Sequence, residues 1–589
     1  MNVALPMIFA LVALVLGYVL YGRRVARWLG VDASRTTPAV EKNDGVDFVP
    51  ARPFVLFGHH YASIAAAGPI VGPTVALAYG YVPTWSWILL GVVFIGAMHD
   101  MTALFLSVRA GGKSIAEVTR GVMGTTGYVL FLAFAVILCV LVGAAFLDLV
   151  AVALTSTYPL TALGLEPSQT LLATVDKGGV PHGVIGGVAS TSVIVMTAAA
   201  PGLGWLIYRR GASLTIALIV SAVICVVSVV VGLTLPLAID PQVWVWVVAA
   251  YCLVAGFIPV WLIIQPRDFT NVQFLYLGII AMVAGVIACG IGGVTIDAPA
   301  FAPADSAATA ALGSIWPVLF VTVACGSISG AHALVASGTT AKQVADERHI
   351  LPIGYGGMLG EALLGVCVTL VILAGLGHAG YQEIVWPVDE HGHLGKGNAA
   401  LAFAAAIGGS LDKGFGLPTV YGTLFGILLL EGFLVTTTDT IVRLTRHLFE
   451  ELWNVLFAGS PPAALKNRVL NTGIPLAMII LLVLDGDWKS VWPVFGTANQ
   501  LLAALTLVTA TAWLMAHKRR YLFTALPAAF MVITTVASLE QLIGKHYGKQ
   551  EWLLLSVDIV LATLAVVVVA LAVRRIIAGA GPREPVESA

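Results

Sequence analysis

The sequence predicts an all-α polytopic membrane protein. Of its 589 residues, 59% are apolar and only 10% are charged, whereas charged residues make up about a quarter of an ordinary soluble domain. The mean hydropathy is +0.95, and apolar windows of membrane-spanning length recur along the chain. The net charge of −1 gives no overall attraction to nucleic acid. We therefore expect the lipid bilayer as surroundings and no nucleic-acid partner.

About fifteen windows are long enough to cross roughly 30 Å of hydrocarbon. They fall near residues 2–21, 56–80, 83–108, 125–156, 185–208, 212–236, 243–264, 272–292, 314–338, 352–376, 417–442, 469–484, 490–516, 520–541 and 552–574. Basic residues follow alternate windows: Arg23 follows the first, Arg109 the third and Arg209 the fifth. Because basic loops stay in the cytoplasm, we expect the N-terminus outside and the C-terminus inside. The first window lacks a basic leader and a cleavage site, which predicts a retained span.

The second window differs from a plain membrane anchor. It carries the adjacent His59 and His60, and glycine–proline pairs interrupt it at Gly68 and Gly72. A break at membrane depth persists only where the freed backbone groups face a cavity or other protein, and transporters build substrate sites from such breaks. Ser63 follows the histidines at helical spacing, so at least one imidazole can share its face. We predict that this broken helix contacts substrate or proton.

A second broken helix is predicted in window 314–338, which runs in the opposite direction. Ser329 and Gly330 interrupt it just before His332, and Ser337 follows one turn later. We take Ser329, His332 and Ser337 as further substrate-binding candidates, because two antiparallel broken helices are what inverted-repeat transporters place around a site. Window 243–264 contains another break, and the sequence does not decide which of the two partners the first.

Ionisable residues inside membrane spans are functional candidates, because a partner or water must offset the cost of burying them. Glu361 lies in the middle of its span, and Asp100 stands next to His99. We assign all three to proton coupling, although helix–helix hydrogen bonding would equally explain Glu361. Neighbouring helix residues point about 100° apart, so His99 and Asp100 need not touch.

Two more charged sites have both a functional and a structural interpretation. Asp439 precedes Arg443 by one helical turn, so it is either a coupling residue or half of an ordinary i,i+4 ion pair. Arg267 and Asp268 follow Pro266 at the end of window 243–264. They are either a cytoplasmic gate or a topological anchor.

One short apolar stretch, 398–408, strains the span count. Counting it as a span would invert all later loops and place their basic residues outside, so we assign it as a re-entrant or interfacial outer segment.

The six cysteines lie in apolar segments without a CxxC motif and are interpreted as small buried hydrophobes. No phosphate-binding GxxxxGK[ST] loop and no HExxH or GxSxG motif is present, so ATP hydrolysis and the commonest hydrolytic centres are not expected.

Several motifs in one order resemble the carbon starvation protein A family. They are GHHYASIAAAGPIVGP, QPRDFTN, CGSISGAHALVASGTTAKQ, IGYGGMLGEALLG, TTTDTIVR and FGTANQLLAALTL. The resemblance spans Arg52 to Leu507. It implies an inner-membrane permease of the amino acid, polyamine and organocation (APC) type, with peptides and pyruvate as the associated substrates and proton symport as the driving force.

The expected architecture is therefore a LeuT-like inverted repeat with discontinuous helices and extra peripheral helices. We expect an N-terminal peripheral helix at 1–30, a transporter core at 52–516, C-terminal peripheral helices at 517–575 and a cytoplasmic tail at 576–589. The alternative is a membrane metal-dependent enzyme or sensor that uses His59, His60 and His332. The sequence does not decide the substrate, the coupling ion, metal binding or the oligomeric state.

Overall fold

The computed structural model describes residues 1–44, 48–65, 67–259, 261–303, 306–389, 391, 394–395, 397–485 and 488–577. Within these residues the chain is almost entirely helical, and its one sheet is small, with strand order β1-β3-β2. The strands are β1 (Tyr158–Pro159), β2 (Thr174–Lys177) and β3 (Val180–Gly183). This architecture confirms the predicted all-α polytopic class.

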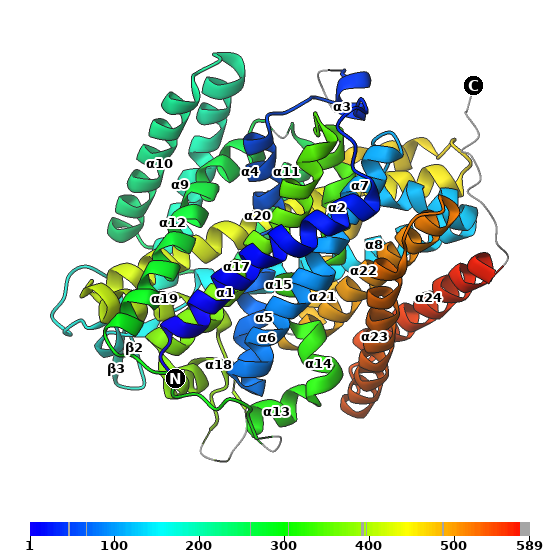
Figure 1. Ribbon diagram of the computed structural model, residues 1–589. Coiled ribbons are helices and arrows are strands. Elements are labelled where there is room, and N and C mark those ends of the chain that lie inside the picture. The colour runs from blue at the N-terminus through cyan, green and yellow to red at the C-terminus, as the bar shows by residue number, and fades with distance from the viewer. Residues whose placement is uncertain are drawn as a thin grey trace.

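Figure 1 shows how the helices are arranged, with the three strands in the connection between α8 and α9. They are α1 (Ala4–Leu16), α2 (Arg23–Leu29), α3 (Pro38–Glu41), α4 (Pro53–Ile64), α5 (Gly68–Ala76), α6 (Tyr81–Gly91), α7 (Ala97–Arg109), α8 (Ile115–Leu154), α9 (Ile185–Gly204), α10 (Leu214–Thr234), α11 (Pro241–Phe257), α12 (Ile264–Ile291), α13 (Ala307–Leu312), α14 (Ile315–Thr322), α15 (Ala324–Ser327), α16 (Gly330–Gly338), α17 (Gly356–Gly375), α18 (Gly377–Val385), α19 (Ala399–Phe415), α20 (Thr419–Leu456), α21 (Arg468–Asp485), α22 (Trp488–Ala516), α23 (Leu522–Lys549) and α24 (Trp552–Ile577).

Twelve helices among the described residues are long and apolar enough to cross a membrane. They match twelve of the predicted windows. The other three windows are the ones in which the sequence shows breaks: 56–80 forms α4 and α5, 243–264 yields the shorter α11, and 314–338 forms α14, α15 and α16. The total of about fifteen spans stays a prediction.

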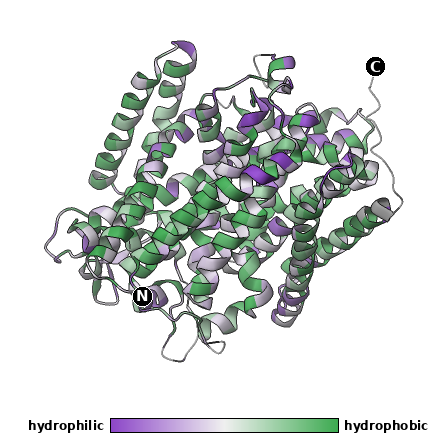
Figure 2. Cartoon of the chain, in the orientation of Figure 1, coloured by the Kyte–Doolittle hydropathy of each residue, from purple (hydrophilic) through white to green (hydrophobic). Residues whose placement is uncertain are grey.

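Burial separates central from peripheral helices. The most apolar stretch of α22 is 94% buried inside the protein, whereas that of α10 is 22% buried. Helices α1, α23 and α24 also expose most of their surface, and Figure 2 shows that hydrophobic residues cover α1. Exposed apolar helices require lipid around them. The proposed division into a core and peripheral helices agrees with this pattern and stays a prediction.

The first broken helix pairs with the second, not with the break after α11. Helix α5 packs against α15, and a Cβ atom added to Gly72 would lie 2.7 Å from the carbonyl oxygen of Thr322. Gly68 makes a similarly close approach to Cys325. The two glycines therefore allow the broken helices to touch, and α11 instead packs against α8, α20 and α21.

Helix α19 extends the predicted re-entrant stretch to Ala399–Phe415. Just before α19, Asn398 Nδ2 donates to Ser156 Oγ beyond the end of α8, at 2.9 Å, and near its C-terminal end Lys413 Nζ donates to the Gly375 carbonyl at the end of α17, also at 2.9 Å. Helices α8 and α17 begin at the other end of the molecule, where Arg109 pairs with Glu347. Both ends of α19 thus lie in one half of the molecule, which favours a re-entrant segment.

Candidate functional site

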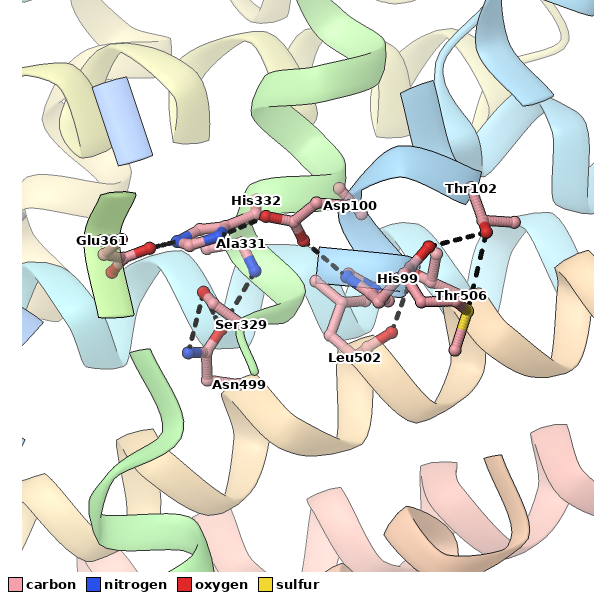
Figure 3. Close-up of polar contacts among 12 residues, drawn as sticks. His99, Asp100, Thr102, Ser329, Ala331, His332, Glu361, Asn499, Leu502 and Thr506 are labelled. Atoms are coloured by element: carbon pink, nitrogen blue, oxygen red, sulfur yellow. Dashed lines mark hydrogen bonds and ion pairs between the residues drawn. The ribbon is translucent and has the colours of Figure 1, made fainter. Parts of the chain in front are cut away.

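Four buried ionisable side chains form a continuous chain of contacts across three helices (Figure 3). His332 of α16 lies between two carboxyl groups: its Nδ1 is 2.8 Å from Asp100 Oδ2, and its Nε2 is 3.2 Å from Glu361 Oε2. The other oxygen of Asp100, Oδ1, is 2.7 Å from Nδ1 of His99. The structure therefore joins α7, α16 and α17 through His99, Asp100, His332 and Glu361.

The break before α16 places His332 in this position. Extended backbone at Ile328 and Ser329 separates α15 from α16, so His332 lies in the first turn of a new helix. The first amide groups of a helix have no intrahelical partner. Asn499 of α22 supplies one, because its Oδ1 accepts from the Ala331 amide at 3.0 Å, and its Nδ2 donates to Ser329 Oγ at 3.1 Å.

Asn499 and its neighbour Gln500 were not among the predicted site residues. Gln500 donates to the carbonyl of Phe320 in α14, so both amides hold the broken helix. In the sequence, these two residues are recognisable as an amide pair inside an apolar span. Such a pair permits either a structural or a cavity-lining role.

The contact chain from His99 to Glu361 is suited to holding protons. All four side chains are buried, and a buried carboxylate is stable only with a hydrogen-bonding or charged partner. One imidazole serves two carboxyl groups, and Glu361 Oε1 has no partner. A proton added to or removed from this chain changes the charge shared by three helices, which makes the site sensitive to proton occupancy.

The histidines of the first broken helix make their described hydrogen bonds with residues outside this contact chain. His60 Nδ1 contacts Thr340 Oγ1 at 2.9 Å, and its Nε2 is buried without a partner. His59 is exposed, and its carbonyl accepts from Ser63 Oγ at 2.8 Å. Among the described polar contacts, none joins either histidine to His332. A substrate-binding role for His59, His60 and Ser63 stays a prediction.

Ser337 has a structural environment. Its hydroxyl donates to the Ala333 carbonyl at 2.6 Å and accepts from the Ile115 amide at 3.0 Å. It thereby fixes α16 to the start of α8.

In the part of the chain that the structure describes, no group of three His, Cys, Asp or Glu side chains has an arrangement that could hold a metal ion. The set His59, His60 and His332 suggested for a metal centre is not brought together.

A second buried cluster surrounds Arg267 of α12. Its Nη2 is 2.8 Å from Asp439 Oδ2 of α20, and its Nη1 donates to the Tyr251 hydroxyl of α11 at 2.5 Å. The same hydroxyl donates to Asp439 Oδ2 at 2.6 Å. Asp268 stands farther away, with Oδ1 3.9 Å from Arg267 Nη2. The guanidinium thus joins three helices.

The i,i+4 ion pair of Asp439 with Arg443 does not form. Arg443 Nη1 donates to the Ile258 carbonyl, at 3.0 Å, just beyond the end of α11. Asp439 faces Arg267 instead. Both of these side chains are fully buried whereas Arg443 is only partly buried, and two buried charges must pair with each other. Glu431, also on α20, is buried with both carboxyl oxygens unpartnered.

The fold and these sites define a membrane transporter with discontinuous helices around buried ionisable groups. The profile described as "Carbon starvation protein CstA" matches residues 2–538. The chain is 30% identical over 570 residues to "Peptide transporter CstA" of Bacillus subtilis (strain 168), a match that covers 91% of this chain and 89% of that protein. The chain belongs to the carbon starvation protein CstA family.

Other relatives carry the names of transporters too. "Peptide transporter CstA" of Escherichia coli (strain K12) is 32% identical, with 89% of this chain and 78% of that protein covered. "Pyruvate/proton symporter BtsT" of the same organism is 28% identical, with 86% and 77% covered. The predicted family and the class of transporter, not enzyme, are confirmed.

A mutant of the Eremococcus coleocola manganese transporter aligns at a TM-score of 0.39 and 11% identity, with 91% of this chain and 98% of that chain covered. The LeuT-like repeat and the APC relationship stay predictions.

Proposed function

We propose that this protein is a secondary active transporter that imports small carboxylate-bearing nutrients, namely peptides or pyruvate, with protons as the coupling ion. The single observation that carries the proposal is the contact chain from His99 to Glu361, which links a helix that starts at a break to two neighbouring helices. The names of the relatives support the substrate class and the proton.

Substrate would bind between the broken helices α4–α5 and α15–α16. Amide groups at the start of a helix attract a carboxylate, and both α5 and α16 begin at this junction. Gly68 and Gly72 keep the two helices close, Ser329 lies at the break, and His59, His60 and Ser63 line the approach. Protonation of Glu361 or Asp100 would change the interaction of that carboxyl group with His332. This change would favour one orientation of α16.

Arg267 and Asp439 would act as a lock on the cytoplasmic side, because they join α12 to α20 next to the break after α11. In this proposal Asp268 assists Arg267 from the half-exposed side. The protein would lie in the cell membrane with its N-terminus outside and its C-terminus in the cytoplasm. Residues 578–589 of the predicted tail lie outside the described residues.

The test is uptake by proteoliposomes that contain the purified full-length chain. Pyruvate and a panel of dipeptides are offered with the exterior acidic, and again after the pH gradient has been collapsed. We expect concentrative uptake of at least one carboxylate substrate and its loss without the gradient. Uptake that is undiminished after collapse of the pH gradient would contradict proton coupling. Absence of uptake for every member of the panel would contradict the substrate class.

A further inference from the structure

A basic cavity lies between the N-terminal helix and the start of α23. Its volume is about 490 Å³, and it is lined by Arg24, Arg27, Trp28 and Arg520. The three arginines are exposed and Trp28 is half-buried. The pocket thus combines two segments that are almost 500 residues apart in sequence. The hydrogen bond from Arg519 to the Leu29 carbonyl, which joins residues 490 positions apart, also links these segments.

Within the described residues, no carboxylate neutralises these three positive charges. Among the described ion pairs, none includes Arg24, Arg27 or Arg520. The carboxylates near this end are engaged elsewhere: Glu347 lies 2.7 Å from Arg109, and Asp32 accepts from the amide and hydroxyl of Ser34. A cluster of guanidinium groups without a counter-charge favours an anion with several oxygen acceptors.

The surroundings of the cavity are those of a membrane interface. The ring of Trp28 lies 5.3 Å from Phe523 and 6.1 Å from Tyr21, and aromatic side chains of this kind gather at the headgroup level of a bilayer. On the flanking helix faces, Leu20, Leu522 and Leu526 are half exposed or more. A molecule in this pocket would meet arginines at one end and apolar surface at the other.

We propose that this pocket binds the phosphate headgroup of an anionic phospholipid from the surrounding leaflet. The arginines would contact the phosphate, and the acyl chains would lie along Leu20 on one side and Leu522 and Leu526 on the other. Basic pockets between membrane helices recognise such headgroups. The lipid would bridge α2 and α23, which already meet through Trp28 and Phe523.

Native mass spectrometry of the purified full-length protein in detergent tests the proposal. Wild type is titrated with dioleoylphosphatidylglycerol and, separately, with dioleoylphosphatidylcholine. The test variant is R24Q/R27Q/R520Q. The matched control is R35Q/R209Q/R210Q, which removes the same charge from exposed arginines outside the pocket.

We expect phosphatidylglycerol to bind wild type in preference to phosphatidylcholine. Each arginine near a membrane surface contributes about fivefold in affinity, so the test variant should bind roughly 100-fold more weakly while the control stays within about fivefold of wild type. Equal losses in both variants would overturn the site, because general charge would then suffice. Equal binding of both lipids, or displacement of phosphatidylglycerol by equimolar inorganic phosphate, would also overturn it.

Discussion

His332 is the residue through which the buried chain is connected, because each ring nitrogen faces a carboxyl group from a different helix. Replacing it by glutamine would leave Asp100 and Glu361 without their shared partner. Loss of one member of a buried charged set costs about 3–5 kcal/mol. We expect H332Q to lower the free energy of unfolding by that order and to abolish uptake, as measured by thermal melting in detergent and by proteoliposome assay.

His60 supplies the matched control for this change. It is also buried, but its one described polar contact is with the neutral hydroxyl of Thr340. H60Q should therefore cost only about 0.5–1.5 kcal/mol, the value of an ordinary hydrogen bond. If H60Q lowers the free energy of unfolding as much as H332Q does, burial alone determines the effect, and not the contact with two carboxyl groups.

Glu361 allows coupling to be separated from binding. E361Q keeps the shape of the protonated side chain but cannot release a proton. We expect it to lose accumulation driven by a pH gradient and to retain exchange of labelled for unlabelled substrate across the same membrane. E431Q is the matched control, because Glu431 is equally buried and has no described contact with His332. Accumulation retained in E361Q would exclude Glu361 as the coupling residue.

Arg267 and Asp439 form a pair whose members depend on each other. D439N would leave a fully buried guanidinium without its counter-charge, and we expect a loss of about 3–5 kcal/mol. The double variant R267M/D439L should recover most of it, since apolar residues of similar size often replace a buried pair at little cost. Melting of the two variants and of R443Q, which should be close to wild type, checks this expectation.

Among the elements, the broken helices were predictable and their pairing was not. Glycine and proline act locally, so the interruptions of 56–80 and 314–338 are visible in the sequence. Which break meets which depends on tertiary packing. The same holds for the site: Asp100 and His332 are each recognisable as ionisable residues in an apolar span, but their contact joins positions 232 residues apart. Local spacing even misleads at Asp439, where it favours Arg443.

The junction of the broken helices depends on the small size of Gly72. A methyl group there would lie 2.7 Å from the Thr322 carbonyl oxygen, which belongs to backbone and cannot rotate away. Over-packing of this kind costs about 1–3 kcal/mol, so we expect G72A to melt earlier and to transport poorly. Gly326 is the control on the facing helix, because a Cβ there would have its nearest neighbour at 3.6 Å. If G326A is as damaging as G72A, the close approach at Gly72 is not the cause.

At the scale of the whole molecule, helices α2 and α7, which carry Arg24 and Arg109, lie away from β2 and β3 (Figure 1). The N-terminus lies on the side of the sheet. Hydropathy predicts where the chain crosses the membrane, and charge asymmetry predicts the direction. The position of α19 requires the fold, because a short apolar stretch suits either a span or a re-entrant segment.

The positive-inside rule gives this molecule one orientation, which single-cysteine labelling can test. Lys177 at the end of β2 and Arg210 in the basic loop between α9 and α10 are both exposed, and they stand at opposite ends of the molecule. Five of the six native cysteines are buried, so their background should be low. We expect a membrane-impermeant maleimide to label K177C in intact cells and R210C only after permeabilisation. The reverse pattern would place the N-terminus in the cytoplasm. It would then also move the proposed lipid pocket to the outer leaflet and the Arg267–Asp439 lock to the external side.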